Sequence, residues 1–281
     1  SECILLEYYI FAPDQTGTAL RDLLIKKLNA GLKVYLLVDS MGSIKLRRDF
    51  MKGFEDAGGQ LCYFHKIGWG GVSSMINFRN HRKIVICDGL VAFTGGVNIT
   101  DTQDLRLDAK AYHDVHMRFE GPIVEWFETV FTEDWHYSNR SADELLGYLK
   151  GKSDERLQRQ RAQAEQLTGK EKIRSLSMQL IPSGPDNELA PILRVMVEAM
   201  HMAQRRIYLT TPYFVPDQSA LFALTSAALR GVDVKVLVPK KTDTYIVGKA
   251  AQSWYEDLIK CGIEVYTYMP RMLHTKTMIV D

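Results

Sequence analysis

Apolar runs of strand length alternate with helical stretches at the start of the chain. The elements predicted from this spacing are strand 4–11, helix 20–28, strand 34–39, helix 46–56 and strand 61–65. Strands that alternate with helices along a chain are typical of an α/β fold with a parallel-rich sheet. We therefore expect a sheet flanked by helices in this part of the chain.

The same order of elements returns later in the sequence. Residues 207–218 repeat the opening strand and its turn, including a shared Pro-Asp-Gln sequence. Residues 230–238 and 261–266 then correspond to residues 30–38 and 58–63. Matched elements in matched order indicate an internal repeat. The predicted fold class is therefore α/β, with two pseudo-twofold-related lobes, each a mixed sheet flanked by helices.

The repeat also predicts the domain boundaries. We expect a first lobe at 1–137, a polar linker at 138–176 and a second lobe at 177–281. The linker is rich in charged residues and has few apolar anchors, which favours a solvated helical segment. A predicted helix at 190–203 precedes the second copy but has no counterpart before the first, and the second copy stops at its motif. We therefore expect a fragment cut at both ends.

One short pattern, H-x-K-x-x-x-x-D, occurs at the same place in both copies. Its members are His81, Lys83 and Asp88 in the first copy and His274, Lys276 and Asp281 in the second. An apolar, β-branched run follows each lysine, and residues two apart on a strand share a face, so imidazole and ammonium are expected side by side. A neutral imidazole is a nucleophile, an imidazolium is a proton donor, and a lysine can hold a phosphate oxygen. The pairing indicates phosphoryl chemistry.

The residues after the first histidine-lysine pair suggest turns. Asp88 stands seven residues after His81, an odd offset that cannot share its face on one continuous strand. Asp88-Gly89 is also a favoured hairpin pair, so the pattern favours a structural turn role for Asp88. The polar turn that follows ends at Asn98, which we interpret either as a donor to a phosphate oxygen or as a left-handed turn residue.

Composition narrows the function classes. The chain has 281 residues, of which 46% are hydrophobic and 25% charged, and a net charge of +1. This is an ordinary globular composition without the basic field that nucleic-acid binding would need. The four cysteines lack a C-x-x-C pattern and mostly lie in apolar runs, which favours reduced thiols over disulfides or zinc. No apolar run approaches the roughly 18 to 20 residues of a membrane span.

Two further features are candidates for roles beside the motifs. Residues 67–79 combine glycines with Trp69 and Phe78 just before the first motif and have no counterpart of similar length in the second copy. Our hypothesis is a lid that touches a bilayer, and the alternative is a packed loop. Three carboxylates are candidate partners that fix a histidine tautomer, although strand carboxylates are more often simply paired or solvated; they are Glu7, Asp114 and Glu120.

These motifs together resemble the phospholipase D superfamily and, within it, bacterial cardiolipin synthases. The resemblance rests on both H-x-K-x-x-x-x-D motifs and on residues 95–98, 112–122, 181–185, 210–216 and 273–276. It implies two lobes that place both motifs in one cleft, without a metal or a cofactor. It also implies a phosphatidyl transferase that makes cardiolipin and glycerol from two phosphatidylglycerol molecules at the bacterial cell membrane, with Trp69 and Phe78 as candidate membrane contacts.

The resemblance further implies roles for the motif residues. His81 is the expected nucleophile that forms a phosphatidyl-histidine, and His274 the expected general acid, although the similarity of the two copies leaves the order open. The phosphate is expected to contact Lys83, Lys276 and Asn98, and Asp88 and Asp281 complete the catalytic motifs. One alternative is a phosphodiesterase that uses water on phospholipid or nucleic acid. Another is a non-catalytic lipid-binding scaffold, which the two intact motifs disfavour.

Overall fold

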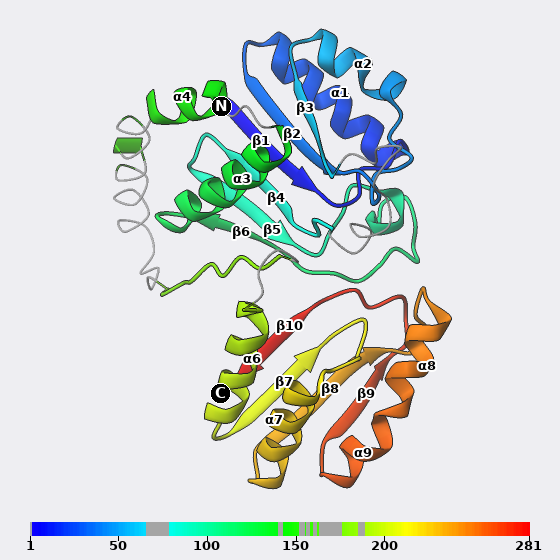
Figure 1. Cartoon of the computed structure of the whole chain (residues 1–281). Coiled ribbons are helices and arrows are strands. Elements are labelled where there is room, and N and C mark those ends of the chain that lie inside the picture. Colours follow the sequence, from blue (N-terminus) through cyan, green and yellow to red (C-terminus); the bar gives the residue numbers. More distant parts are fainter. Residues whose placement is uncertain are drawn as a thin grey trace. The chain divides into compact units, whose positions relative to one another are not determined.

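A computed structural model describes most of the chain as two compact units (Figure 1). The described residues are 2–65, 79–139, 143–151, 155, 158–159, 162, 176–184 and 189–281. The first unit comprises Ser1–Thr100 and His116–Asp186, and the second comprises Asp101–Val115 and Asn187–Asp281. The predicted lid with Trp69 and Phe78, and most of the predicted linker, lie outside the described residues.

The sheet of the first unit has six strands in the order β3-β2-β1-β4-β5-β6. These strands are β1 (Cys3–Tyr8), β2 (Lys33–Asp39), β3 (Gln60–Phe64), β4 (Lys83–Cys87), β5 (Val91–Gly95) and β6 (His116–Glu120). Strands β1, β2 and β3 are parallel to one another, whereas β4 pairs antiparallel with β1 and with β5, and β5 with β6. The mixed sheet confirms the predicted α/β class.

Helices cover both faces of this sheet. They are α1 (Gln15–Asn29), α2 (Arg48–Asp56), α3 (Ile123–Asn139) and α4 (Asp143–Gly151). On one face, Phe54 of α2 belongs to the same apolar cluster as Leu36 of β2. On the other face, Phe131 of α3 belongs to a cluster with Leu37, the next residue of β2. Since successive strand residues point to opposite faces, covering both faces buries nearly every position of β1 and β2.

The second unit repeats part of this strand order in a four-stranded sheet, β10-β7-β8-β9. Its elements are the short 3-10 helix η1 (Asp101–Gln103), α6 (Pro191–Met202), β7 (Arg206–Thr210), α7 (Gln218–Leu229), β8 (Asp233–Pro239), α8 (Tyr245–Ser253), α9 (Tyr255–Lys260), β9 (Glu264–Tyr268) and β10 (Thr277–Val280). Strands β7, β8 and β9 are parallel and β10 is antiparallel to β7, so they correspond to β1, β2, β3 and β4. This is the correspondence that the repeat predicts.

The motif histidines lie before their strands rather than on them, so the prediction that strand geometry aligns each histidine with its lysine is wrong. Strand β4 begins only at Lys83, because its partner β1 ends at Tyr8, the residue that pairs with Lys83. His81 therefore lies in the segment before the strand. Strand β10 likewise begins after Lys276, so both Lys276 and His274 precede it. The motif chemistry is located at the entrance to each strand.

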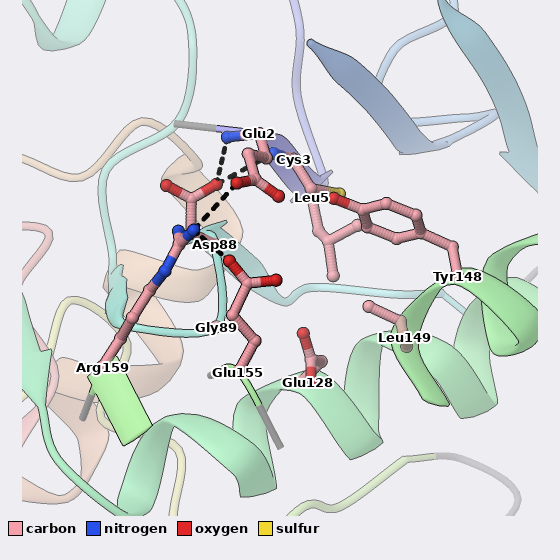
Figure 2. A pocket seen from close by; sticks show the side chains of 10 residues that line it. All are labelled: Glu2, Cys3, Leu5, Asp88, Gly89, Glu128, Tyr148, Leu149, Glu155 and Arg159. Carbon is pink, nitrogen blue, oxygen red and sulfur yellow. Dashed lines mark hydrogen bonds and ion pairs between the residues drawn. The ribbon is translucent and has the colours of Figure 1, made fainter. Parts of the chain in front are cut away.

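Asp88 closes the turn at the far end of β4. Asp88 and Gly89 have φ angles of 58° and 65°, and the Leu90 N–H donates to the Cys87 carbonyl oxygen at 3.0 Å. These values confirm the predicted two-residue hairpin turn. One carboxylate oxygen of Asp88 also accepts the backbone N–H groups of residues 2 and 3, at 2.5 and 2.8 Å (Figure 2). The side chain thus fastens the turn to the start of β1.

Asp281 makes the same kind of contact in the second unit. Its φ angle is 49°, and its carboxylate accepts the backbone N–H groups of Gln204, Arg205 and Arg206 at 3.1, 2.9 and 3.0 Å. These hydrogen bonds lower the pKa of the Asp281 carboxyl. The motif aspartates therefore have a structural role in each unit, at the start of β1 and of β7, and their grouping with the catalytic residues rests on the resemblance alone.

We expect Asp88→Ala to destabilise the first unit by about 2–3 kcal/mol, because two backbone donors lose their charged acceptor and alanine disfavours a positive φ. Asp88→Asn keeps an acceptor oxygen and tolerates the left-handed conformation, so it is the matched control and should lose much less. Urea unfolding followed by circular dichroism measures both changes. Equal stability of the alanine variant and the parent chain would contradict this role.

Candidate active site

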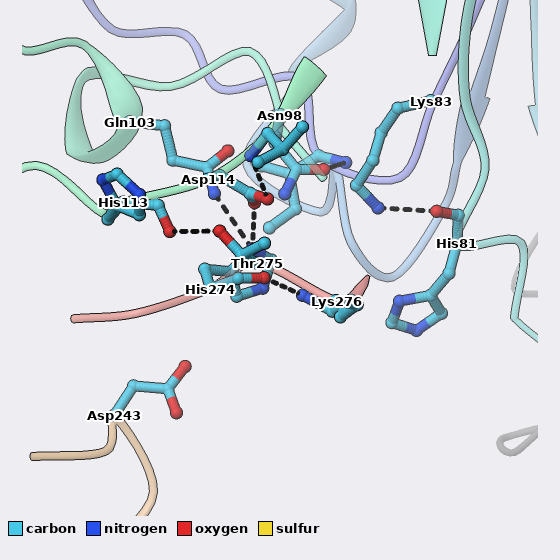
Figure 3. A network of polar contacts seen from close by, with 12 residues as sticks. His81, Lys83, Asn98, Gln103, His113, Asp114, Asp243, His274, Thr275 and Lys276 are labelled. Atoms are coloured by element: carbon cyan, nitrogen blue, oxygen red, sulfur yellow. Dashed lines mark hydrogen bonds and ion pairs between the residues drawn. The ribbon is translucent and has the colours of Figure 1, made fainter. Parts of the chain in front are cut away.

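The two motif lysines make the same contact within their own units. Lys83 Nζ donates to the carbonyl oxygen of His81 at 2.6 Å, and Lys276 Nζ donates to the carbonyl oxygen of His274 at 2.5 Å (Figure 3). Lys83 is buried, whereas Lys276 is exposed along much of its length. Each contact anchors an ammonium group to the backbone of the histidine two residues before it. The repeat therefore extends from the sequence to the geometry of these side chains.

A carboxylate from a distant part of the chain holds the ring of His274. Nδ1 of His274 lies 2.6 Å from Oδ2 of Asp114, whose side chain is 3% exposed (Figure 3). A carboxylate at Nδ1 selects the tautomer with the proton on Nδ1 and leaves Nε2 for chemistry. Gln103 Nε2 lies 3.4 Å from the same Nδ1, and the Tyr112 ring centroid is 5.8 Å from the imidazole centroid. His274 is thus held in one orientation.

A short backbone pairing brings Asp114 to His274. His113 and Leu273 form an isolated parallel bridge, and the His274 N–H donates to the His113 carbonyl oxygen at 2.8 Å. Since Asp114 follows His113 directly, this bridge places its carboxylate beside the imidazole. The bridge also explains why residues 101–115 belong to the second unit, although they precede β6 of the first. The repeat gave no reason to expect this exchange.

The other two candidate carboxylates contact different groups. Glu120 forms an ion pair with Arg118, its neighbour on the same face of β6. Glu7 accepts a hydrogen bond from the side-chain amide of Asn80. Burial, and then the nearby carboxylate of Asp134, raise the pKa of Glu7 well above its ordinary value. Of the three candidate carboxylates, Asp114 contacts a histidine in these interactions. Glu7 and Glu120 contact other side chains, which agrees with the alternative interpretation of the sequence.

Two contacts hold His81 and the residue before it in place. Its imidazole stacks on Tyr9, with ring centroids 3.8 Å apart and an angle of 19° between the planes. The backbone N–H of Asn80 donates to Oδ2 of the buried Asp39, at the end of β2, at 3.1 Å. The stacking restrains the plane of the His81 ring, and the hydrogen bond fixes the segment that carries it. Tyr9 and Asp39 therefore position the first motif.

His81 also lines a cavity of about 300 Å³ within the first unit. Two arginines, Arg79 and Arg82, line it with His81, and so do Ser183 and Gly184. The latter two belong to the stretch 181–185, whose described part therefore lies beside the first motif. Arginine side chains present several donors in a planar fork, which suits a phosphate group. The cavity therefore combines the imidazole and the two arginines with the carboxylates of Glu133 and Asp134, and Asp134 forms an ion pair with Arg82.

Asn98 is buried, and its side-chain oxygen accepts the backbone N–H of Ile10 at 3.2 Å. Its φ angle is not positive, so the interpretation as a left-handed turn residue is wrong. The hydrogen bond ties the turn after β5 to the segment after β1, close in sequence to Tyr9. A phosphate contact of Asn98 stays a prediction.

Two opposing effects act on the ammonium of Lys276. Loss of solvent around the amine lowers its pKa from the ordinary value for lysine, whereas the charges of Asp114 and Asp243 raise it. Asp243 follows β8, and both of its carboxylate oxygens lie within 2.9 Å of the hydroxyl of Tyr213. The contacts of Asp243 and Tyr9 with the motif residues were not predicted, because neither residue belongs to a motif. The available signal was an aromatic residue shortly after the first strand of each copy.

Comparison with known proteins finds similarity to cardiolipin synthases. A family model described as "Cardiolipin synthase, PLD-like domain" matches residues 196–281. The chain is 35% identical over 280 residues to cardiolipin synthase 1 of Bacillus anthracis, covering 99% of this chain and 53% of that protein. It is 36% identical over 280 residues to the major cardiolipin synthase ClsA of Bacillus subtilis (strain 168), covering 99% of this chain and 55% of that protein. The chain thus spans about half the length of these curated relatives.

Solved structures support the fold. A phosphatidylserine synthase of Haemophilus influenzae Rd KW20 matches with a TM-score of 0.60 and 14% identity, covering 100% of this chain and 71% of that one. A polyphosphate kinase of Porphyromonas gingivalis matches with a TM-score of 0.54 and 14% identity, covering 97% of this chain and 38% of that one. The repeated α/β units and the paired histidine-lysine motifs define a phospholipase D-type protein. The chain belongs to the phospholipase D superfamily and, within it, is similar to bacterial cardiolipin synthases.

Proposed function

We propose that this chain carries the catalytic machinery of a phosphatidyl transferase that converts two phosphatidylglycerol molecules into cardiolipin and glycerol. The observation that carries the proposal is the repeated geometry of the motifs, in which each lysine is anchored to its histidine and His274 is held by Asp114. The similarity to cardiolipin synthases supports the choice of a phospholipid substrate.

The proposed reaction uses both histidines on one phosphodiester. Nε2 of His81 attacks phosphorus, the bond from phosphorus to the headgroup oxygen breaks, and His274 gives its proton to that oxygen, which leaves as glycerol. A hydroxyl of a second phosphatidylglycerol then attacks the phosphatidyl-histidine, gives its proton to His274 and releases His81. Asp114 at Nδ1 stabilises the positive charge that His274 carries before the first step and regains in the second. Lys83 and Lys276 supply positive charge to the phosphate oxygens.

The contact between Asp114 and His274 supports one order of the two histidines. Asp114 contacts Nδ1 of His274, which leaves Nε2 to give a proton to the leaving oxygen, so we assign His274 the role of the acid. His81, stacked on Tyr9, then takes the role of the nucleophile. Acid quenching during turnover with labelled phosphatidylglycerol, followed by peptide mapping, tests this order. Label on His81 supports it, label on His274 reverses it, and label on neither contradicts the covalent mechanism.

The place of action proposed here is the bacterial cell membrane, where phosphatidylglycerol is found. No helix within the described residues is long and apolar enough to cross a bilayer. Membrane contact through Trp69 and Phe78 stays part of the proposal, and its test is vesicle binding after both are replaced by serine. Unchanged vesicle binding of that double variant would contradict a lid that touches the bilayer.

Analysis of the lipid products tests the proposed reaction directly. Incubation of the protein with phosphatidylglycerol vesicles should yield cardiolipin and glycerol in equal amounts. Phosphatidic acid as the main product would instead assign a hydrolase, in which water replaces the second lipid hydroxyl. Absence of turnover, with lipid binding retained, would favour a non-catalytic lipid-binding protein.

We expect Asp243→Asn to move the alkaline limb of the pH–rate profile to lower pH. Loss of solvent around the amine lowers the pKa of Lys276, and the charges of Asp114 and Asp243 counteract this. Without the charge of Asp243 the lysine loses its proton at a lower pH, and the cationic form that the phosphate needs is lost earlier as pH rises. Asp243→Glu keeps the charge and serves as the control. An alkaline limb that is unchanged in Asp243→Asn would contradict this coupling.

A further inference from the structure

A second cavity lies in the second unit, at the carboxyl end of β8. Its volume is about 440 Å³, and its lining includes Lys240, Lys241, Asp243 and Lys249. In parallel α/β sheets, ligands bind outside the carboxyl ends of the strands. The cavity is therefore located where this type of sheet places its ligands, and it is distinct from the cavity beside His81.

The charges in this cavity favour an anion. In the part of the chain that the structure describes, none of the three lysines forms an ion pair, and Lys249 donates to the side-chain oxygen of Gln252 at 3.2 Å. The one carboxylate, Asp243, is engaged by the hydroxyl of Tyr213 at 2.8 Å. Three cations against one hydrogen-bonded carboxylate leave a net positive site. Positive charge concentrated in a concave site attracts anionic ligands.

Backbone N–H groups add partial positive charge at this cavity. Helix α8 starts at this cavity, and its N-cap residue Thr244 makes no side-chain capping hydrogen bond. The first N–H groups of a helix carry partial positive charge and bind phosphate groups well. Gly248 lines the cavity in the first turn, where a Cβ atom would come within 2.6 Å of Thr242 Oγ1. The absence of a side chain at this position keeps the loop close to the helix.

Apolar side chains at the rim indicate the source of the anion. Tyr245 lines the cavity and is 76% exposed, and the next residue, Ile246, is 78% exposed. Large apolar side chains beside lysines are typical of segments that lie at a membrane surface, where the rings and alkyl groups enter the interface and the amines meet anionic headgroups. A soluble phosphate would need only the lysines and the helix.

The cavity is also coupled electrostatically to the candidate catalytic residues of the same unit. Asp243 lines it, and the charge of Asp243 raises the pKa of Lys276.

We propose that this cavity binds the phosphate headgroup of an anionic phospholipid, with Tyr245 and Ile246 entering the interfacial region of the bilayer beside it. The proposal rests on the proposed function, because it assigns a lipid to the unit that carries His274. It extends that function by naming a second headgroup site, formed by Lys240, Lys241 and Lys249, outside both motifs.

Vesicle binding tests the site. The triple variant Lys240→Gln, Lys241→Gln, Lys249→Gln should bind vesicles of phosphatidylglycerol and phosphatidylcholine about 100-fold more weakly than the parent, since each lysine near an anionic surface contributes about 5-fold. The matched control replaces three exposed lysines of the first unit with glutamine, for the same change in net charge; they are Lys26, Lys27 and Lys52. The control should lose much less affinity. An equal loss would mean that overall charge governs binding, and would overturn the site.

Two further arms identify the ligand. Tyr245→Ser with Ile246→Ser should weaken binding to vesicles of phosphatidylcholine alone as well, because it removes apolar contacts. Unchanged binding of this double variant would overturn the interfacial role. Millimolar inorganic phosphate should leave vesicle binding intact, whereas full displacement would assign the cavity to a soluble anion. Circular dichroism and urea unfolding should show parent-like folding, since all substituted side chains are exposed.

Product analysis on the same samples separates this proposal from the proposed function. Lysine-dependent binding without cardiolipin formation would contradict the transferase alone. Cardiolipin formation, together with vesicle binding that is unchanged in the triple lysine variant, would contradict the headgroup site alone.

Discussion

Replacement of either motif histidine by asparagine is expected to lower the rate of cardiolipin formation by at least about 10³-fold. Asparagine keeps a polar side chain of similar size but is neither a nucleophile at neutral pH nor a proton donor to an alkoxide. The covalent step needs one imidazole, and protonation of the leaving glycerol needs the other. Quantification of cardiolipin from phosphatidylglycerol vesicles measures the change in His81→Asn and His274→Asn separately.

His201→Asn is the matched control for these two variants. His201 lies in the last turn of α6 and lacks a lysine two residues later. Its replacement should leave the rate within about 2-fold of the parent, as for most exposed positions. Substantial cardiolipin synthesis by either motif variant would overturn the mechanism with two histidines, whatever the result for the control.

Asp114→Asn is expected to lower the rate by about 10³-fold while leaving the binding of lipid vesicles unchanged. The carboxylate lies 2.6 Å from Nδ1 of His274, so its charge stabilises the protonated ring and selects the Nδ1–H tautomer. Asparagine occupies the same space without the charge and can donate to Nδ1, which would select the other tautomer. Asp114 is therefore a positioning residue, and its removal should affect kcat more than KM.

Two observations separate this role from a general loss of structure. Nitrogen NMR at a pH where the His274 ring is neutral should report a proton on Nδ1 in the parent and on Nε2 in Asp114→Asn. Asp104→Asn is the control from the same segment, because Asp104 is paired with Arg106 and should be replaceable without loss of activity. Asp114→Glu should restore part of the rate. A parent-like rate and ring tautomer in Asp114→Asn would show that the contact is incidental.

Most of the correct predictions about the fold came from the internal repeat in the sequence. Matching the two copies correctly predicted parallel strands alternating with helices in each unit, since apolar runs and their order are local features. The antiparallel direction of each motif strand was not predicted. The Asp88-Gly89 turn was also predictable, because positive φ angles at two successive positions favour particular residue types. The odd offset of Asp88 from His81 correctly favoured a turn role for Asp88.

Other features depend on contacts that no local pattern encodes. The start of β4 at Lys83 is set by the end of β1, its partner far away in the sequence, so the strand prediction ran two residues too far. The partner of His274 lies 160 residues before it, and three carboxylates were equally plausible until the bridge at His113 singled out Asp114. The stacking of His81 on Tyr9 is likewise a tertiary contact. Each of these three features is determined by contacts between distant segments rather than by local secondary-structure propensity.

The bridge between His113 and Leu273 means that the two copies are no longer interchangeable modules. A polypeptide made only of the second sequence repeat, 177–281, would contain His274 and Lys276 but would lack the carboxylate that orients the imidazole. Separating the halves at the linker therefore divides the candidate site as well as the chain. If the gene arose by duplication, the second copy came to depend on residues 101–115, which belong to the sequence of the first copy, for the carboxylate that orients His274.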